Sequence, residues 1–489
     1  MTVPTADPAA GAGPTAPTRA VRRGPADLPF RFPDRDLVER LSTERHEPDW
    51  LRADRVAAIE AYEDLPVEAN RLYTPYIDLR TADLLDVRPY VRTDPASVGS
   101  GAVPDGTSGL IELREDAVAA LALSPAAIAA GVTLETLAAA VERDPDVLRA
   151  DLEGGPDLPV DDKFAQLTRS SWTQGVRLVV PAGVQLDLPF LIRWAVGNPG
   201  RALASRTIVR LGEGARASLV EELVASGPEI ACAEGETVPQ ALFTGTLEVR
   251  LDRAAHLSVA SIQDLPPTVV AFQHRHATIG AGAKLDWALA QLGGRLVRSR
   301  VDNRLEGDGS TVEQVEIVFG SQDQVFDLTS YTRHLGRDTT GNLLSKGALQ
   351  DAARSYMKGL IVIDKSAVGT DSFLGEFGMN LSRQARAVAI PSLEIDQPDC
   401  RRAAHSSSVG PIDETQLFYL ESRGIDPDDA RKFIVLGFLE PVVARVPLAD
   451  AQDRLRTLLE EKWAAGAGSQ AVKAAAAPAS SGANDPTRA

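Results

Sequence analysis

The sequence predicts a mainly β protein whose core is a β-helix, flanked by helical regions at both ends. Two observations carry this prediction. Between about residues 165 and 395, short alternating runs such as TIVRL, TLEVRL and VEIVF replace helical periodicity, and such runs are typical of strands. The turns between the runs resemble one another, each with small residues followed by alternation, as in GEGARASLV and GAGAKLDWA.

These similar turns recur at a nearly fixed spacing. Their aligned small residues are Gly183, Gly214, Ala254, Gly282 and Gly309. The separations are 31, 40, 28 and 27 residues, and the long one leaves room for an insertion in the turn-rich segment 227–240. Such a repeat indicates a solenoid, in which each coil buries its apolar edge on its neighbours. An antiparallel β-sandwich with coincidentally similar turns is the alternative.

The rest of the chain divides by composition. The predicted divisions are 1–29 (disordered arm), 30–160 (N-terminal helical region), 161–410 (β-helix core), 411–463 (C-terminal helical domain) and 464–489 (disordered tail). Neither the arm nor the tail can bury enough apolar surface to offset the entropy of ordering. Within the N-terminal region, 34–63 and 115–153 are predicted to be helical, the latter with helix starts at Ser124 and Thr133.

Residues typical of helix ends divide the C-terminal domain into three helices. The signals are the capping pair Asp413 and Gln416, the stop at Gly424 and the start at Asp426-Pro427. The second helix is apolar nearly all round and is expected to stop before Pro441. Three capped helices with surplus apolar surface suggest a docking module, although a simple cap on the solenoid would give the same pattern.

Composition and charge exclude several classes of protein. The net charge is −17, which excludes a generic electrostatic nucleic-acid binder. The N-terminus lacks the apolar segment of a secretory signal and no run of about 18 apolar residues occurs, so we expect a cytoplasmic protein without membrane insertion. The two cysteines, Cys232 and Cys400, cannot build a disulfide framework or a Cys-rich cluster site within one chain.

Few residues suggest chemistry by themselves. No G-x-x-x-x-G-K-[ST] motif occurs, so the chain does not resemble an ATPase. His274 and His276 would share one face of a strand, which a metal could use. No third ligand is apparent in the sequence, however, and a polar face of a coil is the preferred interpretation. His334 fits either a metal ligand or an inward polar group satisfied by hydrogen bonds.

Cys400 and His405 form the other candidate site. A thiolate and an imidazole five residues apart could bind iron or a nascent sulfide cluster. Two ligands cannot hold such a cluster, so a partner chain would have to complete the site. A free cysteine and a structural histidine are the alternative.

Several long motifs resemble one known family. They are EPDWLRADRVAAIEAYEDLP (47–66), KGALQDAARSYMKGLIVIDKSAVGTDSF (346–373), and PSLEI followed by a histidine loop and VGPIDETQLFYLESRGI. Together they resemble the SufB/SufD family, the scaffold subunits of iron–sulfur cluster assembly. The resemblance implies a right-handed parallel β-helix between helical ends. It also implies a non-catalytic subunit that docks the ATPase SufC through its C-terminal helices and pairs with its counterpart through the β-helix.

Within that family the chain looks like SufD. SufB-type chains carry a core cysteine at a position that falls near Glu376 here, and both neighbours of His405 are small rather than acidic. The resemblance implies that His405 is a cluster ligand at the subunit interface. SufD chains usually place a cysteine two residues before this histidine, where Ala403 stands, so Cys400 is the weaker ligand candidate.

The resemblance also implies partners and cargo. The expected partners are a SufC-like ATPase and a SufB-like subunit, with a homodimer as another possibility. The expected cofactors are an iron–sulfur cluster, transient and shared with the partner, and a reduced flavin in the assembled complex. The residues expected to dock the ATPase are Phe418, Arg423, Gly424, Phe433 and Phe438. The rival functions are a SufB-like scaffold, a β-helix polysaccharide lyase or hydrolase, and a β-helix acyltransferase.

Overall fold

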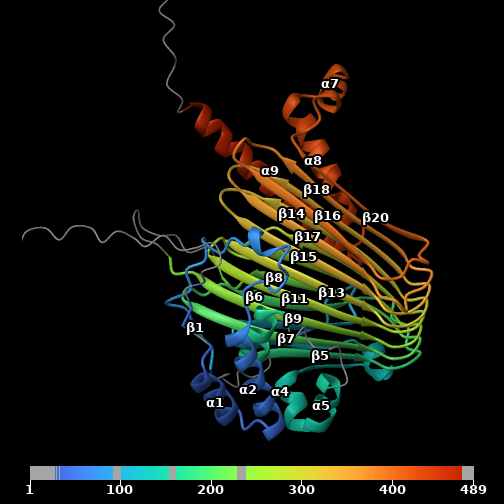
Figure 1. Cartoon of the computed structure of the whole chain (residues 1–489). Helices are drawn as coiled ribbons and strands as arrows, with labels where there is room; N and C mark the ends of the chain where they lie inside the picture. Colours follow the sequence, from blue (N-terminus) through green and yellow to red (C-terminus); the bar gives the residue numbers. More distant parts are fainter. Residues whose placement is uncertain are drawn as a thin grey trace, which may run out of the picture.

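A computed structural model gives the structure of the chain. It describes residues 28, 30–31, 33–91, 101–153, 161–227 and 238–475, with side chains as far as residue 466. The core is a parallel β-solenoid of about eight turns, in which successive strands alternate between two sheets (Figure 1). The β-helix prediction is therefore confirmed, and the antiparallel sandwich is wrong.

We call the two sheets the odd sheet and the even sheet after their strand numbers. The odd sheet contains β5 (Gln174–Val180), β7 (Arg201–Leu211), β9 (Ala241–Leu251), β11 (Val269–Ile279), β13 (Leu296–Leu305), β15 (Val325–His334), β17 (Arg354–Ile363) and β19 (Arg386–Ile395). The even sheet contains β6 (Phe190–Val196), β8 (Arg216–Ala225), β10 (His256–Asp264), β12 (Lys284–Gln291), β14 (Thr311–Gly320), β16 (Thr340–Leu349), β18 (Asp371–Asn380) and β20 (Arg402–Gly410). Equivalent side chains of adjacent coils meet at intervals such as 29 residues, as in the hydrogen bond from Arg298 to Asp327.

A ladder of turn residues explains the repeat seen in the sequence. All five aligned small residues have positive φ, between 56° and 72°: Gly183, Gly214, Ala254, Gly282 and Gly309. Each N–H donates to a carbonyl of the next coil, as Gly282 does to Asp308 at 2.8 Å. Left-handed backbone favours glycine because it lacks a Cβ. The ladder continues through Asp338 and Gly369, which the sequence comparison of turns missed because the aspartate disguises the pattern.

The N-terminal region is only partly helical. Its elements are α1 (Arg35–Glu44), α2 (Asp49–Asp64), η1 (Thr74–Tyr76), β1 (Arg88–Pro89), β2 (Gly109–Arg114), β3 (Ala117–Leu123), α3 (Pro125–Ala129), β4 (Thr133–Thr136), α4 (Leu137–Arg143), α5 (Pro145–Glu153) and α6 (Lys163–Ser171). The predicted helix over 115–153 is wrong at β3 and β4, which add antiparallel strands to the solenoid. Pairing with β2 and β5 outweighs the high intrinsic helix propensity of this Ala/Leu-rich segment, because tertiary context overrides propensity. Ser124 caps α3 as expected, whereas Thr136 rather than Thr133 caps α4.

The C-terminal helices follow the predicted caps. They are α7 (Glu414–Ser422), α8 (Pro427–Val443) and α9 (Ala449–Ala475). Asp413 and Asp426 accept hydrogen bonds from the first turns of α7 and α8, and Gly424 has a φ of 84°. The predicted stop before Pro441 is wrong, because a proline in the last turn removes only one backbone hydrogen bond. Helix α9 reaches Ala475 and so extends into the range predicted as a tail, while 476–489 lie outside the described residues.

The two ends of the chain cover different faces of the solenoid. Leu37, Ile77 and Phe164 of the N-terminal region pack on Leu242 and Phe272 of the odd sheet. On the other side, α8 and α9 pack on the even sheet, with Leu439 and Leu455 among the fully buried contacts. No helix in the described part of the chain is long and apolar enough to cross a membrane.

Candidate functional site

The C-terminal end of the solenoid is open. Strands β19 and β20 are the last strands of the odd and even sheets, and within the described residues no strand pairs with their outer edges. Residues 405–409 of β20 are exposed. An unpaired strand edge presents free N–H and C=O groups, which makes it a template for pairing with another chain. This end is therefore the best candidate for a subunit interface.

Both predicted ligands lie at the open end. His405 is exposed and is the register partner of Leu374 across β18 and β20. Cys400 lies in the loop before β20 and is half-buried, packed with Leu393 and Ala403 on an apolar cluster that includes Leu374. The imidazole is thus exposed to solvent, whereas the thiol contacts apolar neighbours.

A buried carboxyl group lies next to this end. Glu376 on β18 is 1% exposed and is the register partner of Ser407 on β20. Its Oε2 accepts a hydrogen bond from the backbone N–H of Ile390 on β19 at 2.8 Å. Burial raises the pKa of Glu376 to about 8, although this hydrogen bond opposes the shift. The sequence analysis placed Glu376 near the position of the missing core cysteine but gave it no role. The available signal for a buried carboxyl group was a single acidic residue within the strand pattern FLGEFGMN.

Helices α7 and α8 expose two of the predicted docking residues. The side chain of Phe418 on α7 is 71% exposed, and that of Phe433 on α8 is 63% exposed. The Arg423 guanidinium lies 5.3 Å from the ring centroid of Tyr419, which is also exposed. Gly424 forms the left-handed turn after α7. Exposed apolar side chains mark a contact surface where they form a contiguous patch. The docking role of these residues stays a prediction.

Phe438 is placed differently from the other predicted docking residues. It is half-buried and packs on the apolar cluster between α8 and the even sheet. The Nζ of Lys346 lies 4.6 Å from its ring centroid and donates to its carbonyl at 3.1 Å. Burial lowers the pKa of Lys346. These contacts attach α8 to β16, and a docking role for Phe438 stays a prediction.

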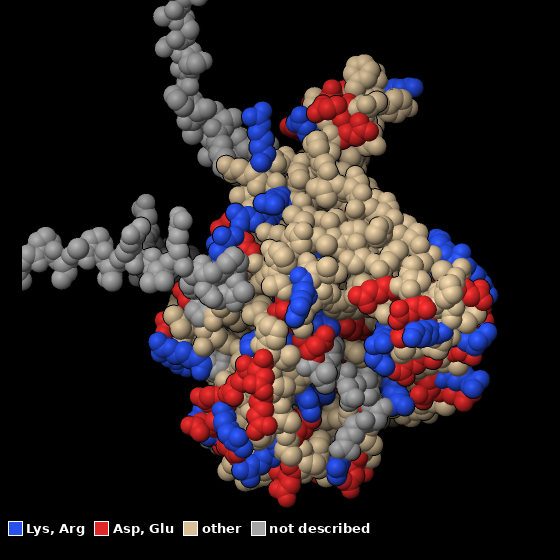
Figure 2. Space-filling view, viewed as in Figure 1, with Lys and Arg blue, Asp and Glu red and all other residues tan. Residues whose placement is uncertain are grey.

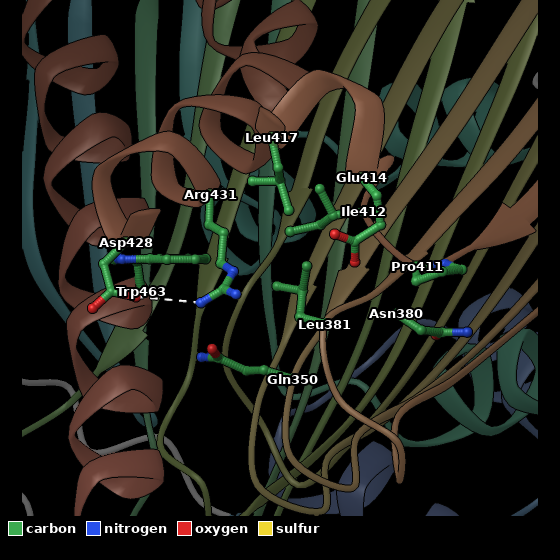
Figure 3. A pocket seen from close by; sticks show the side chains of 10 residues that line it. All are labelled: Gln350, Asn380, Leu381, Pro411, Ile412, Glu414, Leu417, Asp428, Arg431 and Trp463. Carbon is green, nitrogen blue, oxygen red and sulfur yellow. Dashed lines mark hydrogen bonds and ion pairs between the residues drawn. The ribbon is translucent and has the colours of Figure 1, made fainter. Parts of the chain in front are cut away.

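Two hollows separate the α7–α8 pair from the last coils. One, of about 330 Å³, lies between the three C-terminal helices and the turns after the strands, with Glu414, Arg431 and Trp463 on its walls (Figure 3). The other, of about 480 Å³, is mainly apolar and is lined by Phe377 and Phe433 among others. Figure 2 shows charged side chains on α7 and a largely uncharged surface below it, over α8 and the last coils. Helix α7 and the start of α8 therefore project from the solenoid.

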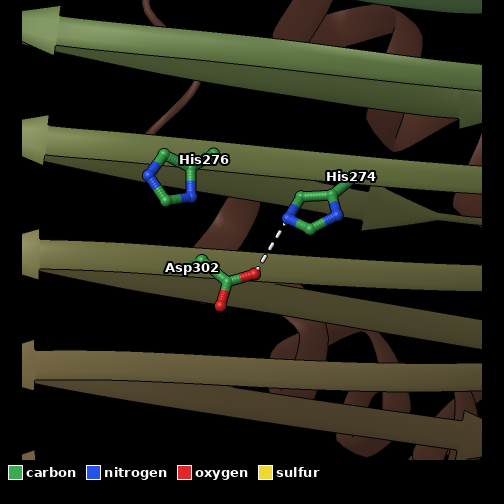
Figure 4. A group of neighbouring side chains, drawn as sticks. All are labelled: His274, His276 and Asp302. Carbon is green, nitrogen blue, oxygen red and sulfur yellow. Dashed lines mark ion pairs between the residues drawn. The ribbon is translucent and has the colours of Figure 1, made fainter. Parts of the chain in front are cut away.

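A third group of polar side chains lies on the outer face of the odd sheet. His274 and His276 are on β11, and Asp302 on β13 is the register partner of His276 (Figure 4). All three are buried, and His274 Nε2 lies 2.8 Å from Asp302 Oδ2. The sequence showed no third ligand because only the register of adjacent coils brings Asp302 to the histidines.

The two remaining candidates from the sequence, His334 and Cys232, are not part of a candidate site. His334 is buried, with Nδ1 2.8 Å from the Thr339 hydroxyl and Nε2 3.1 Å from the Ser372 hydroxyl. Burial lowers its pKa to about 4. It is the hydrogen-bonded polar group of the two interpretations, because both ring nitrogens are occupied. Cys232 lies outside the described residues.

Comparison with known proteins identifies the family. Residues 194–438 match the family model described as SUF system FeS cluster assembly, SufBD core domain. The chain belongs to the SufBD family of iron–sulfur cluster assembly proteins. The matched residues run from β6 to α8 and include the open end with His405.

Individual members of the family agree with this assignment. The chain is 26% identical over 439 residues to iron–sulfur cluster assembly protein SufD of Bacillus subtilis (strain 168), a match that covers 88% of this chain and 98% of that protein. It is 28% identical to a SufBD family protein of Mycobacterium leprae over 62% of this chain and 75% of that protein. A SufBD family protein of Mycobacterium tuberculosis is 32% identical over 45% of this chain and 57% of its own length. The SufD-like prediction gains support, and the polysaccharide-active and acyltransferase alternatives gain none.

Proposed function

We propose that this SufBD family protein is a SufD-like, non-catalytic scaffold subunit of a SufBCD-type complex in the cytoplasm. The open end pairs with a SufB-like subunit, and α7 and α8 bind a SufC-like ATPase. The observation that carries this proposal is the exposed outer edge of β20, with His405 on it, at the end of a solenoid whose other end finishes in the antiparallel strands β3 and β4 of its own N-terminal region. A SufB-like role is less well supported, because Glu376 rather than cysteine occupies the core position.

His405 supplies one ligand to a nascent cluster at the subunit interface. The cluster is cargo, and an imidazole is a suitable ligand for iron. The partner supplies the remaining ligands, because Cys400 packs on the apolar cluster beside Leu393 and Ala403. A second copy of this chain is the alternative partner at the same edge. The reduced flavin stays a prediction from the family resemblance.

The ATPase acts on the interface through the chain connection between β20 and α7. Strand β20 ends at Gly410 and α7 begins at Glu414, so a pull on α7 reaches the outermost strand directly. The two hollows leave room for α7 and the start of α8 to move. Movement of these helices therefore opens or closes the edge that carries His405.

The docking role is tested by replacing exposed aromatic residues with aspartate. We expect Phe433→Asp and Phe418→Asp to abolish co-purification with the candidate SufC-like ATPase and its stimulated ATP hydrolysis, while the thermal midpoint of the isolated chain stays unchanged. Ile128→Asp is the matched control, because Ile128 is 61% exposed on α3 at the other end of the molecule. Full ATPase binding by both phenylalanine variants would overturn the docking proposal.

The ligand role is tested by anaerobic cluster reconstitution of the complex. We expect His405→Ala to leave the complex assembled but to reduce the yield of cluster, since it removes a ligand and not the strand edge. Ser406→Ala is the control on the same strand, because adjacent side chains point to opposite faces. Loss of assembly in His405→Ala would show a structural histidine instead, and an undiminished cluster yield would remove it from the site.

A further inference from the structure

The outer face of the odd sheet holds a buried group with the composition of a metal site. His274 and His276 flank Arg275, whose guanidinium points the other way and donates to Glu221. Alternation along β11 therefore directs both imidazoles outward, toward the N-terminal region. Asp302 stands beside His276 on the adjacent strand. One potential ligand atom from each of the three residues lies within 4.8 Å of the other two.

His276 lacks the partners that a buried imidazole normally has. It is 3% exposed, and within the described residues neither ring nitrogen forms a hydrogen bond. A buried polar group without a partner lowers stability, so such groups call for an explanation. Two other histidines of the solenoid are paired: half-buried His256 with Asp286, and fully buried His334 with two hydroxyl groups.

We propose that His274, His276 and Asp302 bind one divalent transition-metal ion of the Zn²⁺ or Fe²⁺ class. Two imidazoles and one carboxylate, with no thiolate, suit these ions rather than Mg²⁺ or Ca²⁺. Ligand atoms around such an ion stand roughly 3–4 Å apart, given bonds of about 2.1 Å. Small rotations of the three side chains are enough to close the 4.8 Å group to that size.

The charges around the group favour a cation. Arg300 contacts three carboxylates, those of Asp161, Asp162 and Asp302, at 2.8–3.2 Å. Asp162 Oδ2 also lies 3.6 Å from His274 Nδ1. Asp161 is 57% exposed, so the buried part of this group is one guanidinium against the two carboxylates of Asp162 and Asp302. Arg304 and Arg333 on the wall of the adjacent cavity are paired with Glu306 and Asp364. One buried negative charge therefore remains, which a bound cation would offset. Arg300 in turn fixes the orientation of the Asp302 carboxylate, as an outer partner of a ligand does.

An adjacent cavity supplies access and open coordination positions. It measures about 550 Å³, and His276, Asp302 and Tyr331 lie on its wall. Three protein ligands beside a cavity leave room for water or an exchangeable ligand on the ion. The site is remote from the open end: β11 and β13 are separated from β19 by β15 and β17. The inference therefore does not depend on the role of His405.

Cobalt is the probe that tests this site. The full chain, with any affinity tag removed, is titrated with Co²⁺ under anaerobic conditions and followed by its visible absorption. We expect one equivalent to bind, with d–d bands and without the sulfur-to-metal charge-transfer bands that Cys400 would produce. His276→Gln is expected to weaken binding at least tenfold and to remove the Zn²⁺-dependent rise in thermal midpoint. Asp302→Asn is the second variant, in case the first disturbs folding.

Two variants serve as controls. His256→Gln removes another histidine with a carboxylate neighbour, 2.8 Å from Asp286, and is expected to bind Co²⁺ like the unmodified chain. His405→Ala is also expected to retain the equivalent, which separates this site from the open end. The proposal would be overturned if the unmodified chain failed to bind Co²⁺ with micromolar affinity. It would also be overturned if His276→Gln and Asp302→Asn bound Co²⁺ as tightly as the unmodified chain does.

Discussion

The two ends of the solenoid are built differently. At the first coil, β3 pairs antiparallel with β2, and β4 pairs antiparallel with β5, so both sheets end in a strand that reverses direction. At the last coil, β19 and β20 have no such cover in the described part of the chain. The interior residues of the first coil are fully buried, whereas most of β20 is exposed.

The chain covers one end of the solenoid with its own residues and leaves the surface of the other end exposed. Solenoids need a cap at each terminus, because an uncovered coil exposes apolar interior and strand edge. The sealed end is capped by its own N-terminal region. The open end has no such strand in the described part of the chain, and α7 and α8 stand beside it without covering it, so the proposed partner would supply the cap. The difference between the ends therefore predicts measurable differences in stability.

The largest expected effect on the free energy of unfolding comes from truncating a leucine of the odd sheet at each end of the solenoid. Leu178→Ala at the sealed end removes a side chain that is 0% exposed and lies opposite Leu134 of β4. We expect it to lower the free energy of unfolding by about 2–5 kcal/mol, the usual cost of a buried leucine. Leu393→Ala on β19 is expected to cost about 1 kcal/mol, because Leu393 is only half-buried. Urea unfolding of the isolated chain measures both.

The partner should reduce this asymmetry. Added SufB-like subunit is expected to stabilise the unmodified chain against urea more than it stabilises Leu393→Ala, since the partner buries the last coil. Equal costs for the two truncations in the isolated chain would mean that the open end is already covered, and the contrast between the ends would fail.

The next effect is the pH dependence that Glu376 contributes at the open end. Glu376 has a folded-state pKa of about 8, raised by burial above the ordinary value of 4.5. The folded chain therefore holds a proton that the unfolded chain releases, so this group lowers stability as pH rises from about 4.5 to 8 and adds no further loss above that. Glu376→Gln keeps an acceptor for the Ile390 N–H and should remove this loss, with a gain of up to a few kcal/mol near pH 8.

Thermal midpoints across this pH range test the prediction. The difference between Glu376→Gln and the unmodified chain should be small at pH 5 and should grow toward pH 8. Asp364→Asn is a contrasting control, because its pKa is lowered by the Arg333 side chain and so its contribution is lost only as pH falls. A pH-independent difference for Glu376→Gln would mean that Glu376 is ionised throughout.

The sequence could predict the features that rest on local chemistry. The turn ladder at Gly183 through Gly309 and the caps at Asp413 and Asp426 are properties of a few adjacent residues, and they were found. The role of His405 at a subunit interface was predicted from family motifs and stays a prediction, and the exposed strand edge on which it lies was not predicted. The pairing of β3 and β4 and the meeting of Asp302 with His276 depend on which coil lies beside which, and no local pattern encodes that. The same reason hid the burial of Glu376.

The smallest expected effect concerns the turn ladder, which both ends share and which serves as the baseline for the comparison. Gly214 has a φ of 66° and a Cβ built there meets no atom within 4 Å, so Gly214→Ala introduces backbone strain without a clash. We expect a loss of about 1 kcal/mol, because left-handed backbone is unfavourable for a residue with a Cβ. Ala254, at a φ of 56°, already bears that strain.

The reverse substitution should therefore act in the opposite direction. Ala254→Gly is expected to raise the free energy of unfolding by up to about 1 kcal/mol, reduced by the greater flexibility of glycine in the unfolded chain. Urea midpoints of the two single variants and the double variant measure the effects, which should nearly cancel because the two turns lie in neighbouring coils without side-chain contact. Two losses instead of a loss and a gain would mean that the Cβ of Ala254 packs favourably, and that the ladder is not uniform along the solenoid.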